Sequence, residues 1–324
     1  MKLFTVAAND ANQRLDKFLR KAAPGLPPAL LYKALRTKHI KVNGRRAHGD
    51  YRLLEGDAVA CWLSDEFFSP SAYAFDFLRA GRQLEVLYED ERMLLLDKPA
   101  GLLSHPDEGE YVDTLLGRAQ RYLYEKGEYD PGRENAFAPA LVNRIDRNTQ
   151  GIVIAAKTAQ ALCDLNGMMK RREIHKYYLC AVHNNAESKM QNAEWVQLRS
   201  WMSKDEGKAL VRVHGAPGPG RKECLTNYRV LDARPSPLYP DACLLEVELL
   251  TGRTHQVRAQ FAALGHALVG DGKYAPRAQY KAGPAKRQCL CSWRIQLGEL
   301  DVSVGKVGFL EEIFPGVEIG KLGL

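Results

Sequence analysis

The chain has 324 residues, of which 45% are hydrophobic and 26% are charged, which is enough for about two domains with a core each. Its formal net charge of +7 fits a polyanionic partner and fits a merely basic protein equally well. No hydrophobic run approaches the roughly 18 residues of a membrane helix, and the N-terminus is too weakly hydrophobic for a secretory signal, so we expect a cytoplasmic protein without membrane contact.

The first 63 residues predict a small α/β domain. Hydrophobic side chains recur at helical spacing in residues 15–22 and again after the proline pair at 27–28, which is a favourable helix start. Residues 40–46 (IKVNGRR) predict a short strand that enters an Asn-Gly hairpin turn, and DAVACWL (57–63) predicts a second strand. Residues 14–46 hold ten Lys or Arg side chains and one acid. This imbalance favours a polyanion as the partner of this domain.

The remaining chain predicts a linker followed by a larger domain. Residues 64–83 mix Ser, Pro, Asp and aromatic side chains without a period and are typical of a linker. From residue 84 onward strand patterns dominate: LEVLY, RMLLLDK, ALVNRI, GIVIAAK, IHKYYLCAV, CLTNYRVLDA, ACLLEVELL and LCSWRIQL. We expect helices at 114–124, in TAQALCDLNGMMK and after TGRTH, and loops at 127–139 and 215–221. Many strands with few helices predict an α+β fold with a mixed, mainly antiparallel sheet for residues 84–324.

Several classes of protein are disfavoured by what the chain lacks. It has no βαβ alternation, no GxGxxG and no P-loop motif, which argues against dinucleotide and nucleotide-triphosphate binding. Its seven cysteines are odd in number and do not have the spacing of a disulfide framework or of a zinc ribbon. We therefore expect a reducing compartment, no metal and no cofactor.

Three segments hold candidate functional residues. NRIDRNTQG (143–151) places Asp146 between Arg144 and Arg147 in a polar turn, where neighbouring cations would keep a nucleophilic or stabilising carboxylate ionised. Taken alone, these residues are explained better by an ordinary turn in which an aspartate pairs with an arginine than by a catalytic site.

The second segment, TGRTHQVRAQF (251–261), gathers Arg253, His255 and Arg258 at a helix start. These cations could bind a phosphate or a carboxylate between them. The alternative interpretation is a basic turn exposed to solvent. In the third segment, IHKYYLCAV, alternation puts Lys176 and Tyr178 on one face of a strand. Core packing is the default explanation for a buried tyrosine there.

Taken together, these segments resemble the RluA-type pseudouridine synthases. NRIDRNTQGIVIAAKT is similar to their His-Arg-Leu-Asp-x-x-Thr-Ser-Gly motif and the strand that follows it, and TGRTHQVRAQFAALGHALVGDGKY is similar to their Thr-Gly-Arg-Thr-His-Gln-Ile-Arg signature. VLYEDERMLLLDKPAGLLSHP, KYYLCAV and LTNYRVL fall in the family's order, so the resemblance spans about residues 84–297. Residues 14–63 resemble the alpha-L RNA-binding motif that many of these enzymes carry.

The resemblance implies the pseudouridine synthase fold, isomerisation of uridine in structured RNA without a cofactor, and base flipping. The matching positions are Asp146 as the catalytic carboxylate, Tyr178 against the uracil and Arg258 as the partner of Asp146. Further substrate contacts are expected from Arg144, Thr149, Lys176, Arg253 and His255. Phosphate contacts of the N-terminal domain are expected from Lys33, Arg36, Lys38, Lys41, Arg45 and Arg46.

The chain departs from the family pattern at Asn143, Ile145 and Gln150, which stand where His, Leu and Ser are common. The first and last of these bear on the choice of RNA target more than on activity. The resemblance favours large-subunit ribosomal RNA as the substrate. The sequence is silent on oligomeric state, and a monomer is the default expectation. Transfer RNA is the alternative substrate, and a catalytically degenerate RNA-binding protein or a glycosidic hydrolase with two carboxylates are the alternative functions.

Overall fold

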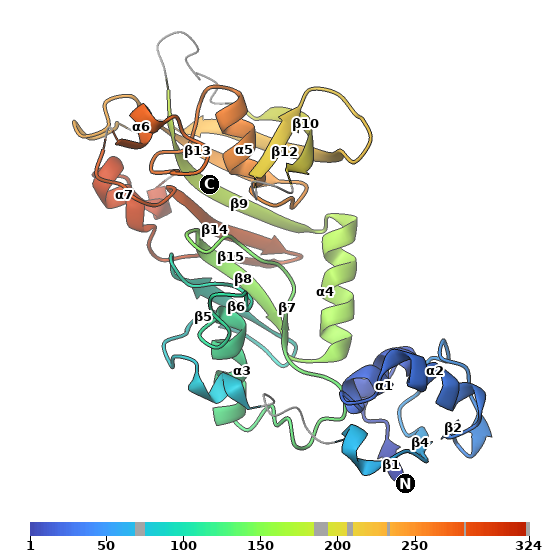
Figure 1. Cartoon of the computed structure of the whole chain (residues 1–324). Helices are drawn as coiled ribbons and strands as arrows, with labels where there is room; N and C mark the ends of the chain where they lie inside the picture. The colour runs from blue at the N-terminus through green and yellow to red at the C-terminus, as the bar shows by residue number, and fades with distance from the viewer. Residues whose placement is uncertain (69–74, 185–193, 206–209, 232–233, 282, 322–324) are drawn as a thin grey trace.

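The computed structural model describes residues 1–68, 75–184, 194–205, 210–231, 234–281 and 283–321. A small four-stranded sheet near the N-terminus and a large sheet of eleven strands organise the chain. Figure 1 shows the small domain at one end of the molecule, next to the start of the long helix α4, with the large sheet extending away from it.

The N-terminal domain has the two helices and the hairpin that the sequence predicts. Its elements are β1 (Lys2–Thr5), α1 (Leu15–Ala22), α2 (Pro28–Arg36), β2 (Ile40–Val42), β3 (Arg45–Arg46) and β4 (Ala58–Cys61). Strand order is β1-β4-β2-β3, so the unpredicted β1 completes the sheet. Asn43 and Gly44 have positive φ of 51° and 74°, as a tight hairpin turn requires. Phe18, Leu19 and Leu31 belong to a hydrophobic core of this domain's own.

The predicted linker contains local structure where it is described. Two 3-10 helices, η2 (Asp65–Phe68) and η3 (Asp76–Arg79), lie in it, while residues 69–74 lie outside the described residues. Phe67 packs against the core of the N-terminal domain, and Phe77 is buried in a core cluster of the large domain. The two ends of the segment therefore belong to different cores.

The large sheet has the order β11-β10-β12-β13-β9-β14-β8-β6-β5, with β15 beside β14 and β7 beside β8. All these pairs are antiparallel except β8 with β14, which is parallel. The strands are β5 (Glu85–Glu89), β6 (Met93–Lys98), β7 (Ala140–Leu141), β8 (Gln150–Ala156), β9 (Ile174–His183), β10 (Val196–Asp205), β11 (Leu210–His214), β12 (Lys222–Leu231), β13 (Ala242–Leu249), β14 (Leu290–Leu297) and β15 (Leu300–Ser303). This architecture confirms the predicted α+β class with a mixed, mainly antiparallel sheet.

Some local predictions were wrong. The segment ALVNRI is a strand only at Ala140–Leu141, because the chain then leaves the sheet as the loop that carries Asp146. Strands β10, β11 and β15 and helices α6 (Arg277–Lys281) and α7 (Gly308–Ile313) were not predicted. The three strands are only partly buried, and polar or charged side chains stand among their hydrophobic ones, so none of them forms a hydrophobic run.

Helices pack against both faces of the large sheet. One hydrophobic cluster joins α3 (Leu115–Glu125) and α5 (Gln256–Ala263) to one face. A second joins α4 (Ala159–Arg171) and α7 to the other. Among the described residues, no helix is long and apolar enough to cross a membrane.

Candidate active site

The loop between β7 and β8 carries Asp146 and is held by the segment that follows β6. Lys98 Nζ and Gly101 N both donate to the carbonyl oxygen of Arg147, at 3.0 and 2.7 Å. Ser104 Oγ donates to the carbonyl oxygen of Ile145 at 2.9 Å and accepts from the amide of Ile145 at 3.3 Å. The residues on either side of Asp146 are therefore fixed by backbone contacts across the fold.

Arg258 connects Asp146 to a second, deeper carboxylate. Its Nη1 donates to Oδ2 of Asp146 at 2.8 Å, while Nε and Nη2 bind both oxygens of Asp271 at 2.7 and 2.9 Å. Side-chain exposure is 23% for Asp146, 8% for Arg258 and 0% for Asp271. Burial opposes the charge on Asp271, but the hydrogen bonds and the charge of Arg258, together with the amides of Lys273 and Tyr274, lower the pKa of that carboxyl. The predicted pairing of Asp146 with Arg258 is present.

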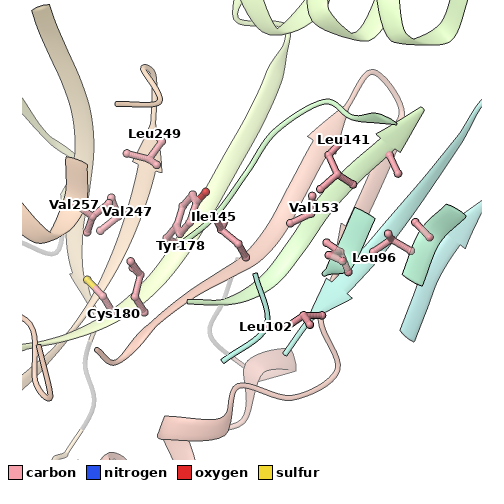
Figure 2. Packing of buried hydrophobic residues seen from close by; sticks show 14 of the residues in the cluster. Leu96, Leu102, Leu141, Ile145, Val153, Tyr178, Cys180, Val247, Leu249 and Val257 are labelled. Carbon is pink, nitrogen blue, oxygen red and sulfur yellow. The ribbon is translucent and has the colours of Figure 1, made fainter. Parts of the chain in front are cut away.

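Tyr178 stands on the central strand β9 and faces the same side of the sheet as Asp146. Figure 2 shows its ring among the hydrophobic side chains of this face, including Ile145 and Leu249. Burial raises its pKa to about 12, so the phenol is neutral at physiological pH. The neighbouring Tyr177 points to the opposite face and packs against the other cluster, as strand alternation predicts.

A cleft of about 670 Å³ opens beside these residues. It is lined by Asp146, Tyr178, Arg258 and every other candidate in the large domain: Arg144, Thr149, Lys176, Arg253 and His255. The exposed Arg144 and Arg253 lie at its rim. Thr149, by contrast, is only 1% exposed, and its amide donates to the carbonyl oxygen of Asp146 at 3.0 Å. Its main visible role is to close the turn.

A second hollow of about 500 Å³ lies on the other side of Asp146. Basic side chains line it: His105, Arg144, Arg147, His255, Arg258, Lys273 and Lys286. Within the described part of the chain, no group of three His, Cys, Asp or Glu side chains is arranged to hold a metal ion.

Several residues of this site were missed by sequence reasoning. Asp271 was missed because it ends the hydrophobic stretch ALVGD and has no charged neighbour before it. The GDGKY segment, which resembles the family's sequence, could have identified it. Lys98 is 0% exposed and donates to three carbonyl oxygens. No local sequence pattern predicts that this lysine is buried, because one of its partners, Arg147, comes from a distant segment.

The two polar departures from the family pattern have structural partners. Asn143 Oδ1 accepts from the amide of Ile154 at 2.8 Å. Gln150 donates to the carbonyl oxygen of Lys306 at 2.8 Å and accepts from the amide of Gly308 at 3.1 Å. Asn143 also lines the cleft. Gln150 instead ties β8 to the C-terminal segment.

The candidate phosphate-binding side chains of the N-terminal domain lie on its surface. Lys33, Arg36, Lys38, Arg45 and Arg46 are exposed and Lys41 is partly exposed. None of these six cations has an ion-pair partner among the described residues.

An aspartate clamped by an arginine beside a buried tyrosine, in a cleft rimmed by cations, is the arrangement expected of an enzyme that acts on RNA. Comparison with known proteins gives the family. Residues 92–263, more than half of the chain, match the family described as RNA pseudouridylate synthase. The chain belongs to this family and is an RNA pseudouridine synthase.

Relatives of known name agree. The ribosomal large subunit pseudouridine synthase C of Vibrio cholerae is 32% identical over 277 residues, which cover 82% of this chain and 78% of that protein. The enzyme of the same name from Escherichia coli is 29% identical over 283 residues, covering 86% and 81%. The solved structure of human RNA pseudouridylate synthase domain containing 1 has a TM-score of 0.57 at 19% identity, covering 74% of this chain and 91% of that one. It supports the fold.

Proposed function

We propose that this enzyme converts uridine to pseudouridine in large-subunit ribosomal RNA, with Asp146 as the catalytic carboxylate. The observation that carries the role of Asp146 is its asymmetric environment. Oδ2 is held by Arg258 at 2.8 Å, whereas no hydrogen bond reaches Oδ1 from the described residues. The names of the relatives from Vibrio cholerae and Escherichia coli support ribosomal RNA as the substrate.

The reaction breaks the bond between the anomeric carbon of the ribose and N1 of uracil, and then joins the same carbon to C5. C5 gives up its proton and N1 takes one, so the product is an isomer of the substrate. The reaction needs no oxidant and no water. A carboxylate can attack the sugar, remove a proton from it or stabilise positive charge on it. In each case the acting oxygen must point into the cleft while the other holds the side chain still. Oδ1 and Oδ2 of Asp146 divide these tasks.

Tyr178 and the cleft support entry of a single flipped base. A base inside a helix is reached only by extrusion, which costs a few kcal/mol and must be offset by new contacts. The Tyr178 ring and the side chains of Ile145, Leu249 and Val257 present an apolar wall for uracil. Lys176 and the rim arginines Arg144 and Arg253 are available for the flanking phosphates.

A glycosidic hydrolase is less well supported. Such enzymes use two carboxylates, one of which acts as an acid. Asp107 lines the second hollow, but its Oδ1 accepts from the amides of Gly109 and Glu110 in its own loop. The acid bound to the same arginine as Asp146 is Asp271, which is 0% exposed. Arg258 occupies both of its oxygens, and Oδ1 also accepts from the amides of Lys273 and Tyr274 at 2.9 and 3.1 Å. It has no proton to offer and no path to substrate.

Pseudouridine mapping tests the proposal directly. RNA from cells lacking the protein would be labelled for pseudouridine and read by reverse-transcription stops, with complementation by wild type, Asp146→Asn and Asp164→Asn. The last is a matched control, because Asp164 also pairs with an arginine, Arg92 at 2.7 Å, on the surface. We expect wild type and Asp164→Asn to restore defined ribosomal positions and Asp146→Asn to restore none.

Other outcomes separate the parts of the proposal. Loss of pseudouridine in transfer RNA alone would overturn the substrate and keep the chemistry. Full activity of Asp146→Asn would overturn its catalytic role, and release of free uracil would favour the hydrolase.

The N-terminal domain is proposed to hold the RNA backbone. Its cations should add to affinity without regard to sequence, and each lost phosphate contact should lower the salt dependence of binding. We expect Lys33→Gln with Arg36→Gln to weaken binding to many RNAs and to reduce the slope of log affinity against log salt by about 1–2. Arg121→Gln, whose arginine pairs with Glu125 at 2.9 Å, is the control. An unchanged slope would contradict this role.

A further inference from the structure

His255 is held at its Nδ1 atom by the hydroxyl of Tyr274. His255 precedes helix α5 and has a left-handed backbone conformation, with φ of 54°, which is uncommon for a residue other than glycine. Nδ1 lies 2.7 Å from Tyr274 Oη, and the other ring nitrogen, Nε2, lies 3.9 Å from Oδ2 of Asp146. The imidazole therefore presents Nε2 to the catalytic cleft, of which His255 is a lining residue.

The hydrogen bond between Tyr274 Oη and His255 Nδ1 has its hydrogen on one of the two atoms, and the backbone of β11 bears on which one. The backbone amide of Val211, on the edge strand β11, donates to Tyr274 Oη at 3.1 Å. An amide can only donate, so the phenol oxygen accepts there and has one hydrogen of its own to give. No other hydrogen-bond partner of this hydroxyl occurs among the described residues. The hydroxyl already accepts from Val211, so its own hydrogen is available to Nδ1 of His255, the other polar atom that contacts it among the described residues. In that arrangement Nδ1 is unprotonated and accepts.

The electrostatic surroundings keep the ring neutral. Burial lowers the pKa of His255, and the cations Arg258 and Lys273 act in the same direction, against Asp146 and Asp271. A neutral imidazole whose Nδ1 accepts a hydrogen bond carries its hydrogen on Nε2. Nε2 is then a hydrogen-bond donor and not a base.

We propose that Tyr274 is a positioning residue that fixes His255 as the Nε2–H tautomer, and that this N–H donates a hydrogen bond to a carbonyl oxygen of the bound uracil. The proposal rests on the cleft's being the uridine site. When the glycosidic bond breaks, uracil keeps the bonding electrons and its carbonyl oxygens gain negative charge. A fixed donor stabilises that charge as it develops, and a neutral imidazole can do so without adding a cation.

Three variants test the donor role. His255→Ala removes the N–H, His255→Gln replaces it with an amide N–H, and Tyr274→Phe removes only the hydroxyl while keeping the ring that lies 5.3 Å from the Arg258 guanidinium. Single-turnover pseudouridine formation would be measured on a transcript of large-subunit ribosomal RNA, with RNA affinity and thermal unfolding measured alongside. We expect His255→Ala to slow the chemical step about 100-fold with affinity unchanged, and His255→Gln to recover part of the rate.

The tautomer is tested independently of activity. In protein labelled with ¹⁵N-histidine, the His255 resonances at about pH 7 should show a protonated Nε2 and an unprotonated Nδ1 in wild type. In Tyr274→Phe they should move toward a mixture of the two tautomers. A proton on Nδ1 in wild type would overturn the tautomer assignment.

Equal rates for folded, RNA-binding His255→Gln and His255→Ala would overturn the donor role. Either result leaves the role of Asp146 intact, because that role is decided by Asp146→Asn.

Discussion

Asp271 lies behind the pair of Asp146 and Arg258, and Asp271→Asn removes its charge while preserving its shape. The carboxylate is 0% exposed and binds Nε and Nη2 of Arg258 at 2.7 and 2.9 Å. In the variant an amide NH₂ would face the guanidinium, and Asp146 would be the only carboxylate left in contact with the buried Arg258. Removing one partner of a buried ion pair costs about 3–5 kcal/mol. We expect a loss of that order in the free energy of unfolding.

The assay is denaturation of the full-length protein in urea, followed by fluorescence, with Asp164→Asn as the matched control. Asp164 pairs with Arg92 at 2.7 Å, but their side chains are 39% and 60% exposed. A surface pair of this kind contributes about 0–1 kcal/mol. A loss for Asp271→Asn no larger than the loss for the control would refute the reasoning that Asp271 neutralises a buried cation.

The same variant separates positioning from catalysis. Without Asp271 to hold Nε and Nη2, Arg258 can reorient on Asp146 and bind both of its oxygens, so the single contact to Oδ2 is no longer fixed and Oδ1 is no longer left open. We expect slower pseudouridine formation in the fraction that remains folded, with RNA affinity nearly unchanged. Unchanged turnover would show that Asp146 does not depend on this support.

Two further predictions concern the scaffold. Gly151 has φ of 118°, and a Cβ there would lie 2.1 Å from the carbonyl oxygen of Ser292 on β14. Gly151→Ala should therefore lower the melting temperature far more than Gly127→Ala, whose Cβ meets nothing, and equal shifts would contradict this. Burial lowers the pKa of Lys98 from 10.5 to about 7. Above that pH the unfolded chain holds a proton that the folded chain has released, so the free energy of unfolding should rise by up to about 1.4 kcal/mol per pH unit between about pH 7 and 8.5. Lys98→Met should lose this contribution, and identical slopes in the two proteins would count against it.

Local sequence patterns predicted the position of an element correctly where its buried residues recur with the period of a helix or a strand. The N-terminal helices, the β5–β6 hairpin and helices α3 and α4 lie within a residue or two of their predicted places. Thr114 and Thr158 cap α3 and α4 by accepting from Gly117 N and Ala161 N, at 3.1 Å in each case. Asp146 and Arg258 are 112 residues apart, and only the family resemblance paired them in advance.

The missed elements share a physical cause. Strand β10 lies between the edge strand β11 and β12, and only two of its residues, Ser200 and Met202, are buried, so tertiary pairing decides its structure more than its own pattern does. Lys98 stands in the hydrophobic run MLLLDK, where a lysine suggests the end of a strand. Its burial depends on carbonyl oxygens of Pro99, Leu102 and Arg147, which no local pattern predicts.

Chemistry in this site depends on how few donors surround Asp146. An arginine that faced Asp146 alone could bind both carboxylate oxygens. Here Nε and Nη2 of Arg258 are directed at Asp271, and Nη1 makes a single hydrogen bond to Oδ2 of Asp146. Ser104 and Lys98 fix the loop backbone on either side of the aspartate instead of contacting its side chain. Asp146 is thus held in place through Oδ2 and the loop, while Oδ1 accepts no hydrogen bond from the described residues, which is what its proposed role toward the ribose requires.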